Sequence, residues 1–161
     1  MFVGKGGNDV VKGPADGNYI VCTGTGNDII TLGNGDFTIS AGTGSNSITT
    51  GNGDGYISSG TASDKITTGN GVQTIDADGG NNTVLTGNGD KTVTTGTGND
   101  IVTTGSGADV VNAGGGTNNV SSGAGNDNVT TGTGNDTING GADADTCDAG
   151  GGINSVSNCA P

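Results

Sequence analysis

The sequence contains no histidine, arginine, glutamate or tryptophan, and only two prolines, two tyrosines and two phenylalanines. The usual general bases and oxyanion-binding side chains are therefore missing, and nothing could activate the many serines and threonines, so we expect no enzyme. The only basic residues are four lysines in a chain of net charge −12, which argues against nucleic acid as a partner. Because no apolar run approaches ~20 residues, we also expect no membrane insertion.

Glycine, by contrast, supplies 37 of the 161 residues, and all 16 acidic residues are aspartate. Glycine this frequent excludes long helices, since each glycine inside a helix costs about 1 kcal/mol relative to alanine. A hydrophobic content of 28% with a strong net charge is typical of disordered chains, so disorder is the alternative to a folded structure. Because Met1–Val3 enters the pattern without a leader, we expect a mature or excised segment.

A nine-residue period from Gly24 onward argues against disorder, because a disordered chain has no reason to maintain a repeat at a constant spacing. Glycine opens every block except the one that begins at Asp78, and it usually returns at the third position. The seventh position is aliphatic until it becomes cysteine, and reads Ile30, Ile39, Ile48, Ile57, Ile66, Ile75, Val84, Val93, Val102, Val111, Val120, Val129, Ile138, Cys147 and Val156.

Each block has the chemistry of a tight turn followed by a short strand. Glycines at the first and third positions permit positive φ, and the β-branched and polar residues at positions six to eight favour a strand with one inward side chain. Two blocks make an 18-residue coil whose two parallel strands face each other, and stacked coils bury the seventh positions in a thin core. The predicted fold is all-β, a parallel β-solenoid of 18-residue coils, each two nine-residue half-turns.

The beginning of the chain fits the period less well. One extra residue near Thr23 separates the regular blocks from an earlier coil, whose inward residues we expect to be Val11 and Ile20. The sequence therefore predicts an irregular N-terminal coil over residues 1–23 and a regular solenoid over residues 24–146.

The fifth position of the blocks carries the candidate metal ligands. Alternate blocks define what we call the first edge, where the fifth position reads Asp28, Asn46, Asp64, Asn82, Asp100, Asn118, Asp136 and Asn154. On the second edge it reads Phe37, Gly55, Gln73, Lys91, Asp109, Asp127 and Asp145. Carboxylates ~5 Å apart on successive coils repel by roughly 3 kcal/mol at an effective dielectric of 20, and bound cations would relieve this repulsion. The alternative is a hydrogen-bonded ladder of Asp and Asn without metal.

The segment Thr23–Thr31 reads TGTGNDIIT, and Gly96–Val102, Gly123–Val129 and Gly132–Ile138 follow the same pattern. This pattern resembles the nonapeptide of repeats-in-toxin (RTX) calcium-binding proteins, G-G-x-G-x-D-x-U-x with U aliphatic. The resemblance implies a right-handed parallel β-roll in which aspartates and turn carbonyls of successive coils bind several Ca²⁺ ions. The ligands it implies are Asp9, Asp28, Asn46, Asp64, Asn82, Asp100, Asn118 and Asp136 on the first edge, and Asp109, Asp127 and Asp145 on the second.

The last cysteines extend the resemblance. The stretch from Asp145 through Cys147 to Cys159 is similar to the terminal cap of some secreted RTX proteins, in which two cysteines pair. It implies a disulfide-bonded cap over residues 147–161 and an extracellular location, since disulfides persist in oxidising compartments. The alternative is two unpaired buried thiols. Cys22 is left over and is expected to be a free packed thiol, with an intermolecular link as the alternative.

Threonine and asparagine side chains beside the turns form the candidate ligand surface. Alternate residues of an extended backbone point the same way, so we expect two small polar groups per coil. The expected residues are Thr50, Asn52, Thr68, Asn70, Thr86, Asn88 and Thr104 on the second edge, and Thr25, Thr97, Asn99 and Thr133 on the first. The sequence Gly-Thr-Gly-Asn-Asp also resembles the repeat of calcium-dependent bacterial ice-binding domains, which implies ice or another regular surface as the partner.

Two other functions remain open at this point. Threonine favours strands and short turns in any protein, so the chain could be a Ca²⁺-stiffened structural spacer, surface-layer or filament-forming segment. Such a rod could associate end to end through unpaired strand edges. Carbohydrate binding is less favoured because aromatic platforms are almost absent, with only Phe37 and Tyr56 available on one edge.

Overall fold

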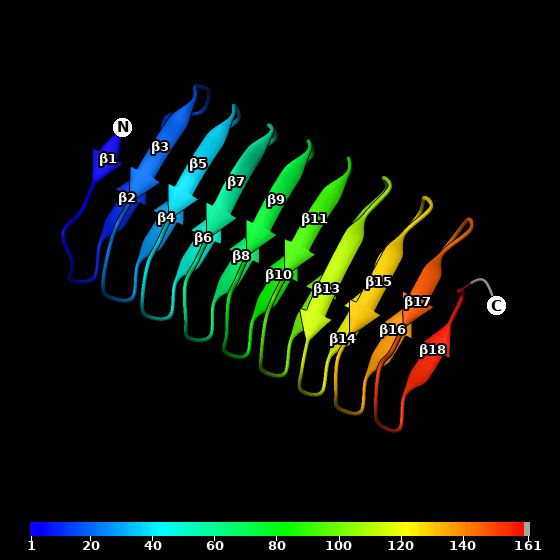
Figure 1. Cartoon of the computed structure of the whole chain (residues 1–161). Helices are drawn as coiled ribbons and strands as arrows, with labels where there is room; N and C mark the ends of the chain where they lie inside the picture. The colour runs from blue at the N-terminus through cyan, green and yellow to red at the C-terminus, as the bar shows by residue number, and fades with distance from the viewer. Residues whose placement is uncertain (160–161) are drawn as a thin grey trace.

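The computed structural model describes residues 1–159, which form a flattened rod of two parallel nine-stranded sheets (Figure 1). The chain alternates between the sheets, so odd-numbered strands build one and even-numbered strands the other. Sheet A contains β1 (Phe2–Val3), β3 (Tyr19–Cys22), β5 (Phe37–Ser40), β7 (Gly55–Ser58), β9 (Gln73–Asp76), β11 (Lys91–Thr94), β13 (Val110–Gly114), β15 (Asn128–Thr131) and β17 (Thr146–Asp148). Sheet B contains β2 (Val10–Lys12), β4 (Ile29–Thr31), β6 (Ser47–Thr49), β8 (Lys65–Thr67), β10 (Thr83–Leu85), β12 (Ile101–Thr103), β14 (Asn119–Ser121), β16 (Thr137–Asn139) and β18 (Ser155–Ser157).

The strands pair in the register that the period predicts. Ile57 pairs with Ile75 in sheet A, and Val84 pairs with Val102 in sheet B, an offset of one 18-residue coil in each case. Every seventh-position side chain from Ile30 to Ile138 is buried. Each such side chain contributes roughly 1.5–3 kcal/mol when it leaves water. The predicted all-β solenoid of 18-residue coils is confirmed, and its core lies between the two sheets and consists mainly of these aliphatic side chains.

The first coil differs from the prediction. Val21, which is 2% exposed, continues the aliphatic stack, while Ile20 is 52% exposed, so the expectation that Ile20 points inward was wrong. Val21 pairs with Ile39 at the normal offset, whereas Val11 pairs with Ile30 one residue further away. The extra residue therefore lies between Val11 and Val21, within the stretch that contains Pro14, and not near Thr23.

Glycine is required where one turn lies directly on the turn below. Gly116 has φ +124°, and a Cβ added there would lie 1.9 Å from the carbonyl oxygen of Gly98 in the preceding coil. Neighbouring Gly115 has no positive φ, and the nearest atom to its added Cβ is Thr133 Oγ1 at 3.6 Å. Turn contacts of the first kind recur along both edges, as at Gly125 and Gly134, so a side chain at these positions would collide with the backbone of the preceding coil.

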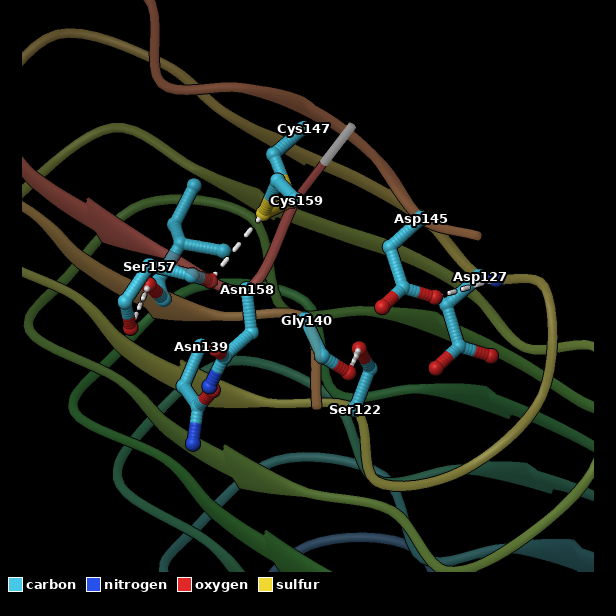
Figure 2. Close-up of a disulfide and its surroundings, with 10 residues drawn as sticks. Ser122, Asp127, Asn139, Gly140, Asp145, Cys147, Ser157, Asn158 and Cys159 are labelled. Atoms are coloured by element: carbon cyan, nitrogen blue, oxygen red, sulfur yellow. Dashed lines mark hydrogen bonds between the residues drawn. A yellow bond between two sulfur atoms is a disulfide. The ribbon is translucent and has the colours of Figure 1, made fainter. Parts of the chain in front are cut away.

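The C-terminal coil is closed by the predicted disulfide. Cys147 and Cys159 are bonded, with their Cα atoms 5.9 Å apart (Figure 2). Cys147 occupies the seventh position and pairs with Val129 on β15, so the bridge ties the chain end to the core stack. Residues 160 and 161 of the predicted cap lie outside the described residues. Cys22 is a free thiol, and it is exposed on sheet A rather than packed inside. No helix in the described part of the chain is long and apolar enough to cross a membrane.

Candidate metal sites on the turn edges

A continuous hydrogen-bond ladder runs through the fifth positions of the first edge. The backbone N–H of each fifth-position residue donates to the side-chain Oδ1 of the fifth-position residue in the next coil, from Asp9 to Asn154, over distances of 2.7–3.0 Å. The side chains between these ends, from Asp28 to Asp136, are buried. Aspartate and asparagine both offer Oδ1 as an acceptor, so this ladder accepts either residue.

The second atom of each side chain separates the two residue types. In the aspartate coils, Oδ2 is buried and has no hydrogen-bond partner, as at Asp28, Asp64, Asp100 and Asp136. In the asparagine coils, the same place holds an amide that donates to turn carbonyls. Asn46 Nδ2, for example, lies 2.8 Å from the carbonyl oxygen of its own turn and 3.0 Å from that of Ser59 in the next coil.

The second edge has a similar ladder only in its C-terminal part. The backbone N–H of Lys91 donates to Asp109 Oδ1, that of Asp109 to Asp127 Oδ1, and that of Asp127 to Asp145 Oδ1. Figure 2 shows the Asp127 and Asp145 carboxylates beside each other on successive coils. The Oδ2 atoms of these three aspartates are also buried without a partner.

Other groups fill the fifth positions of the earlier coils on the second edge. Phe37 is buried, and its ring occupies the space into which a Cβ at Gly55 would project. Gln73 Nε2 donates to the carbonyl oxygens of Gly53 and Gly69. These coils therefore contain no orphaned carboxylate oxygen.

Burial controls the electrostatics of both edges. Loss of water contact raises the pKa of the Asp64 and Asp100 carboxyls above their ordinary 3.8, against the opposing effect of their hydrogen bonds. Burial also raises the pKa of Asp127, and repulsion from Asp109 and Asp145 adds to that increase. Without a counter-ion the folded chain therefore resists ionising these carboxyls.

The donor set fits a hard divalent cation. Eight buried carboxylate oxygens have no partner: Oδ2 of Asp9, Asp28, Asp64, Asp100, Asp109, Asp127, Asp136 and Asp145. Residues 1–159 hold no group of three or more His, Cys, Asp or Glu side chains able to ligate one ion. Each cation would therefore take most of its ligands from turn carbonyls, and all-oxygen coordination of this kind suits Ca²⁺.

Comparison with known proteins gives a family for this arrangement. The family model of the RTX calcium-binding nonapeptide repeat, in four copies, matches at residues 23–48, 38–66, 49–84, 58–93, 67–102, 85–120, 94–129 and 121–156. These matches together span well over half of the chain. The chain belongs to the RTX calcium-binding repeat family. Ca²⁺ is therefore its ligand, as predicted. Neither the curated proteins nor the solved structures contain a match to this chain.

Within this RTX repeat, the predicted asparagine ligands do not fit the observed geometry. Asn46, Asn82 and Asn118 use Oδ1 to accept the N–H of the preceding coil, and direct Nδ2 toward carbonyl oxygens. An amide N–H cannot ligate a cation. The sequence pattern showed the alternation of Asp and Asn. It did not show that, at equivalent turns, aspartate places a carboxylate oxygen where asparagine places an amide N–H group.

Four residues of the predicted ligand surface are buried. Thr50, Thr68, Thr86 and Thr104 are only 4–6% exposed, so they do not contribute to an outer face. They occupy the ninth position, where strand alternation turns the side chain inward. The glycine that follows begins the turn, and the next residue, asparagine or serine, is exposed. The predicted residues Asn52, Asn70, Asn88, Thr25, Thr97, Asn99 and Thr133 are exposed.

The sequence reasoning missed further exposed threonines on the first edge. Thr43 and Thr61 occupy the second position, like Thr25, and are exposed as it is. Thr25 and Thr43 are joined by a parallel bridge, so their coils are in register there. Reading the second and fourth positions of every block as one column each would have found them, since both columns are visible in the printed sequence.

Proposed function

We propose that the unpartnered carboxylates hold Ca²⁺ on both edges and that the ions stiffen the rod. On the first edge the proposed ligands are Asp9, Asp28, Asp64, Asp100 and Asp136; on the second they are Asp109, Asp127 and Asp145. Bound Ca²⁺ would neutralise these buried charges and link the turns of successive coils. The observation that supports this proposal is the set of buried Oδ2 atoms without a hydrogen bond, because an uncompensated buried charge is costly.

We further propose that the first edge binds ice, as a non-enzymatic function outside the cell. From Thr25 to Ile153, the second and fourth positions of this edge contain no charged residue, and Thr25, Thr43 and Thr61 are exposed on three successive coils. Stacked coils repeat these hydroxyl groups every ~4.8 Å. The second edge carries Asp36, Asp54 and Asp90 at its fourth position, which favours the first edge for a neutral lattice.

Hydrogen bonds hold part of this surface in a fixed geometry. Asn27 Oδ1 accepts the backbone N–H of Ser45, and Asn99 Oδ1 accepts that of Thr117 in the next coil. Side chains that are already ordered lose little entropy when they bind a rigid lattice. The disulfide supports an extracellular role, because such bonds persist in oxidising compartments.

Ice-affinity partitioning with Thr43→Tyr tests the proposal on the Ca²⁺-loaded chain. The bulky ring should interrupt the threonine column and reduce the fraction of protein taken into ice severalfold. Thr49→Tyr is the matched control, since Thr49 is also exposed but lies on the outer face of sheet B. If both variants partition like the unsubstituted chain, the first edge is not an ice-binding surface.

A rigid spacer is the second candidate function. Strands β1 and β2 each have a partner on one side only, at one end of the rod, and the disulfide lies at the other end. Unpaired strands can recruit another chain. Light scattering in Ca²⁺ would show a mass above that of the monomer if the rods join through this end, and a monomer without ice affinity would favour a spacer that acts alone.

A further inference from the structure

Side-chain nitrogen atoms occupy the place of the cation in several coils. We infer that the amides of the first-edge asparagines and the ammonium of Lys91 act as built-in substitutes for Ca²⁺, so the fifth-position residue decides coil by coil which turns take an ion. The inference rests on the proposed metal sites. It adds which turns bind Ca²⁺ and which hold a side-chain nitrogen atom instead.

The first edge shows the substitution in alternate coils. Asn82 Nδ2 lies within hydrogen-bond distance of the carbonyl oxygens of Ala77, Gly80 and Thr95, at 3.2–3.4 Å. Asn46 Nδ2, two coils earlier, has similar surroundings, with three carbonyl oxygens at 2.8–3.5 Å. Between them, the buried Asp64 places an oxygen atom without a partner. The same fold thus presents either a donor or an anion to equivalent turns.

Lys91 makes the clearest case because its head group is itself a cation. The residue is 1% exposed, and its Nζ donates to the carbonyl oxygens of Gly71, Asn88 and Gly89 at 2.6–2.8 Å. Lysine is almost never fully buried unless its charge is compensated. Here the compensation comes from backbone oxygens of two successive turns, which is the kind of ligand that a bound Ca²⁺ would use.

The position of Lys91 also explains where the aspartates of the second edge begin. The next coil starts the run of Asp109, Asp127 and Asp145, and Asp109 Oδ1 accepts the backbone N–H of Lys91. We therefore place the boundary between the metal-free and the metal-binding parts of this edge at Lys91. On the first edge, the alternation that begins at Asp28 separates successive ions by two coils, or ~9.6 Å, which weakens their mutual repulsion.

Native mass spectrometry of the full chain in Ca²⁺ counts the ions directly. Asn82→Asp replaces the donor by an anion and should bind one more ion than the unsubstituted chain. Asn81→Asp is the matched control: it adds the same charge to the same turn at an exposed position, and should add no ion. On the second edge, Lys91→Asp should also add one ion, whereas Lys91→Gln should add none, because Gln73 shows that an amide there binds the carbonyls.

The outcomes separate this inference from the proposal beneath it. If the unsubstituted chain binds no Ca²⁺, the proposed metal sites fail and the inference falls with them. If it binds Ca²⁺ but Asn82→Asp and Asn81→Asp give the same ion count as the unsubstituted chain, only the substitution rule is overturned. Circular dichroism would show whether Lys91→Asp folds; if it does not, the Asn82→Asp comparison decides.

Discussion

Replacing Asp127 by asparagine should change stability in opposite directions with and without Ca²⁺. Asp127 is buried between Asp109 and Asp145 on neighbouring coils, and its Oδ2 has no partner. The introduced asparagine would keep Oδ1 as the acceptor for the N–H of Asp109, a bond of 2.8 Å, and would direct an amide toward the turn carbonyls. In EDTA the substitution therefore removes a repulsive charge, whereas in Ca²⁺ it removes a ligand.

The expected magnitudes follow from this geometry. Carboxylates on successive coils lie ~4.8 Å apart, and each pair repels by roughly 3 kcal/mol at an effective dielectric of 20. Proton uptake relieves part of this repulsion, because burial raises the pKa of Asp127. We expect Asp127→Asn to stabilise the metal-free chain by about 1–3 kcal/mol. Loss of one ion site at a Ca²⁺ concentration ~100 times its Kd would cost about 2.7 kcal/mol.

Urea unfolding followed by circular dichroism, in EDTA and in Ca²⁺, measures both effects. The control is Asp148→Asn, which removes the same charge from an exposed residue whose Oδ1 accepts the N–H of Gly150, a bond that asparagine can keep. This control should leave both free energies of unfolding nearly unchanged. A loss of stability in EDTA as large as the loss in Ca²⁺ would refute the reasoning, since it would show that the carboxylate is needed even without a cation.

Three further predictions follow from the same features. In EDTA, the free energy of unfolding should rise as pH falls from 7 toward 4. Carboxyls such as Asp100 have a folded-state pKa raised by burial, so they take up protons more readily in the folded chain than in the unfolded one. A series of unfolding measurements at different pH in which the free energy of unfolding falls instead would contradict this. Gly116→Ala should lower the melting temperature clearly, since its Cβ would meet a carbonyl at 1.9 Å with φ +124°, whereas Gly115→Ala should have little effect. Reducing the bond between Cys147 and Cys159 should accelerate hydrogen exchange in β17 and β18 selectively and cost up to about 3 kcal/mol; uniform exchange along the rod would argue against a local cap.

The solenoid could be predicted from the sequence because each block repeats one inward residue at a fixed place. Ile30, Ile39 and their successors need no information from outside their block to be placed in the core. In the first coil, no regular block identifies the inward residue in this way. Tyr19, Ile20, Val21 and Cys22 form an apolar run in which either central residue could point inward, and only the pairing of Val21 with Ile39 decides the register.

The ligand surface was harder to predict because it depends on the path of the backbone at the turn. Thr50 and Asn52 are two residues apart, and in an extended strand they would lie on one face. The intervening Gly51 begins the turn, so Thr50 points into the core and Asn52 outward. Local alternation therefore holds within each short strand but fails at its end, where the glycine changes the direction of the chain.

The fifth position shows why fold and metal content are separable in this repeat. The ladder along the first edge uses only Oδ1, which Asp28 and Asn46 supply equally well, so exchanging one residue for the other leaves the stacking of coils intact. The remaining atom decides whether the turn carbonyls meet an oxygen anion or an N–H group. The second edge shows the same tolerance at its fifth position, where Phe37 places a ring, Gln73 an amide and Lys91 an ammonium group. If the proposed metal sites are correct, a single substitution should therefore add or remove an ion site while the solenoid around it stays the same.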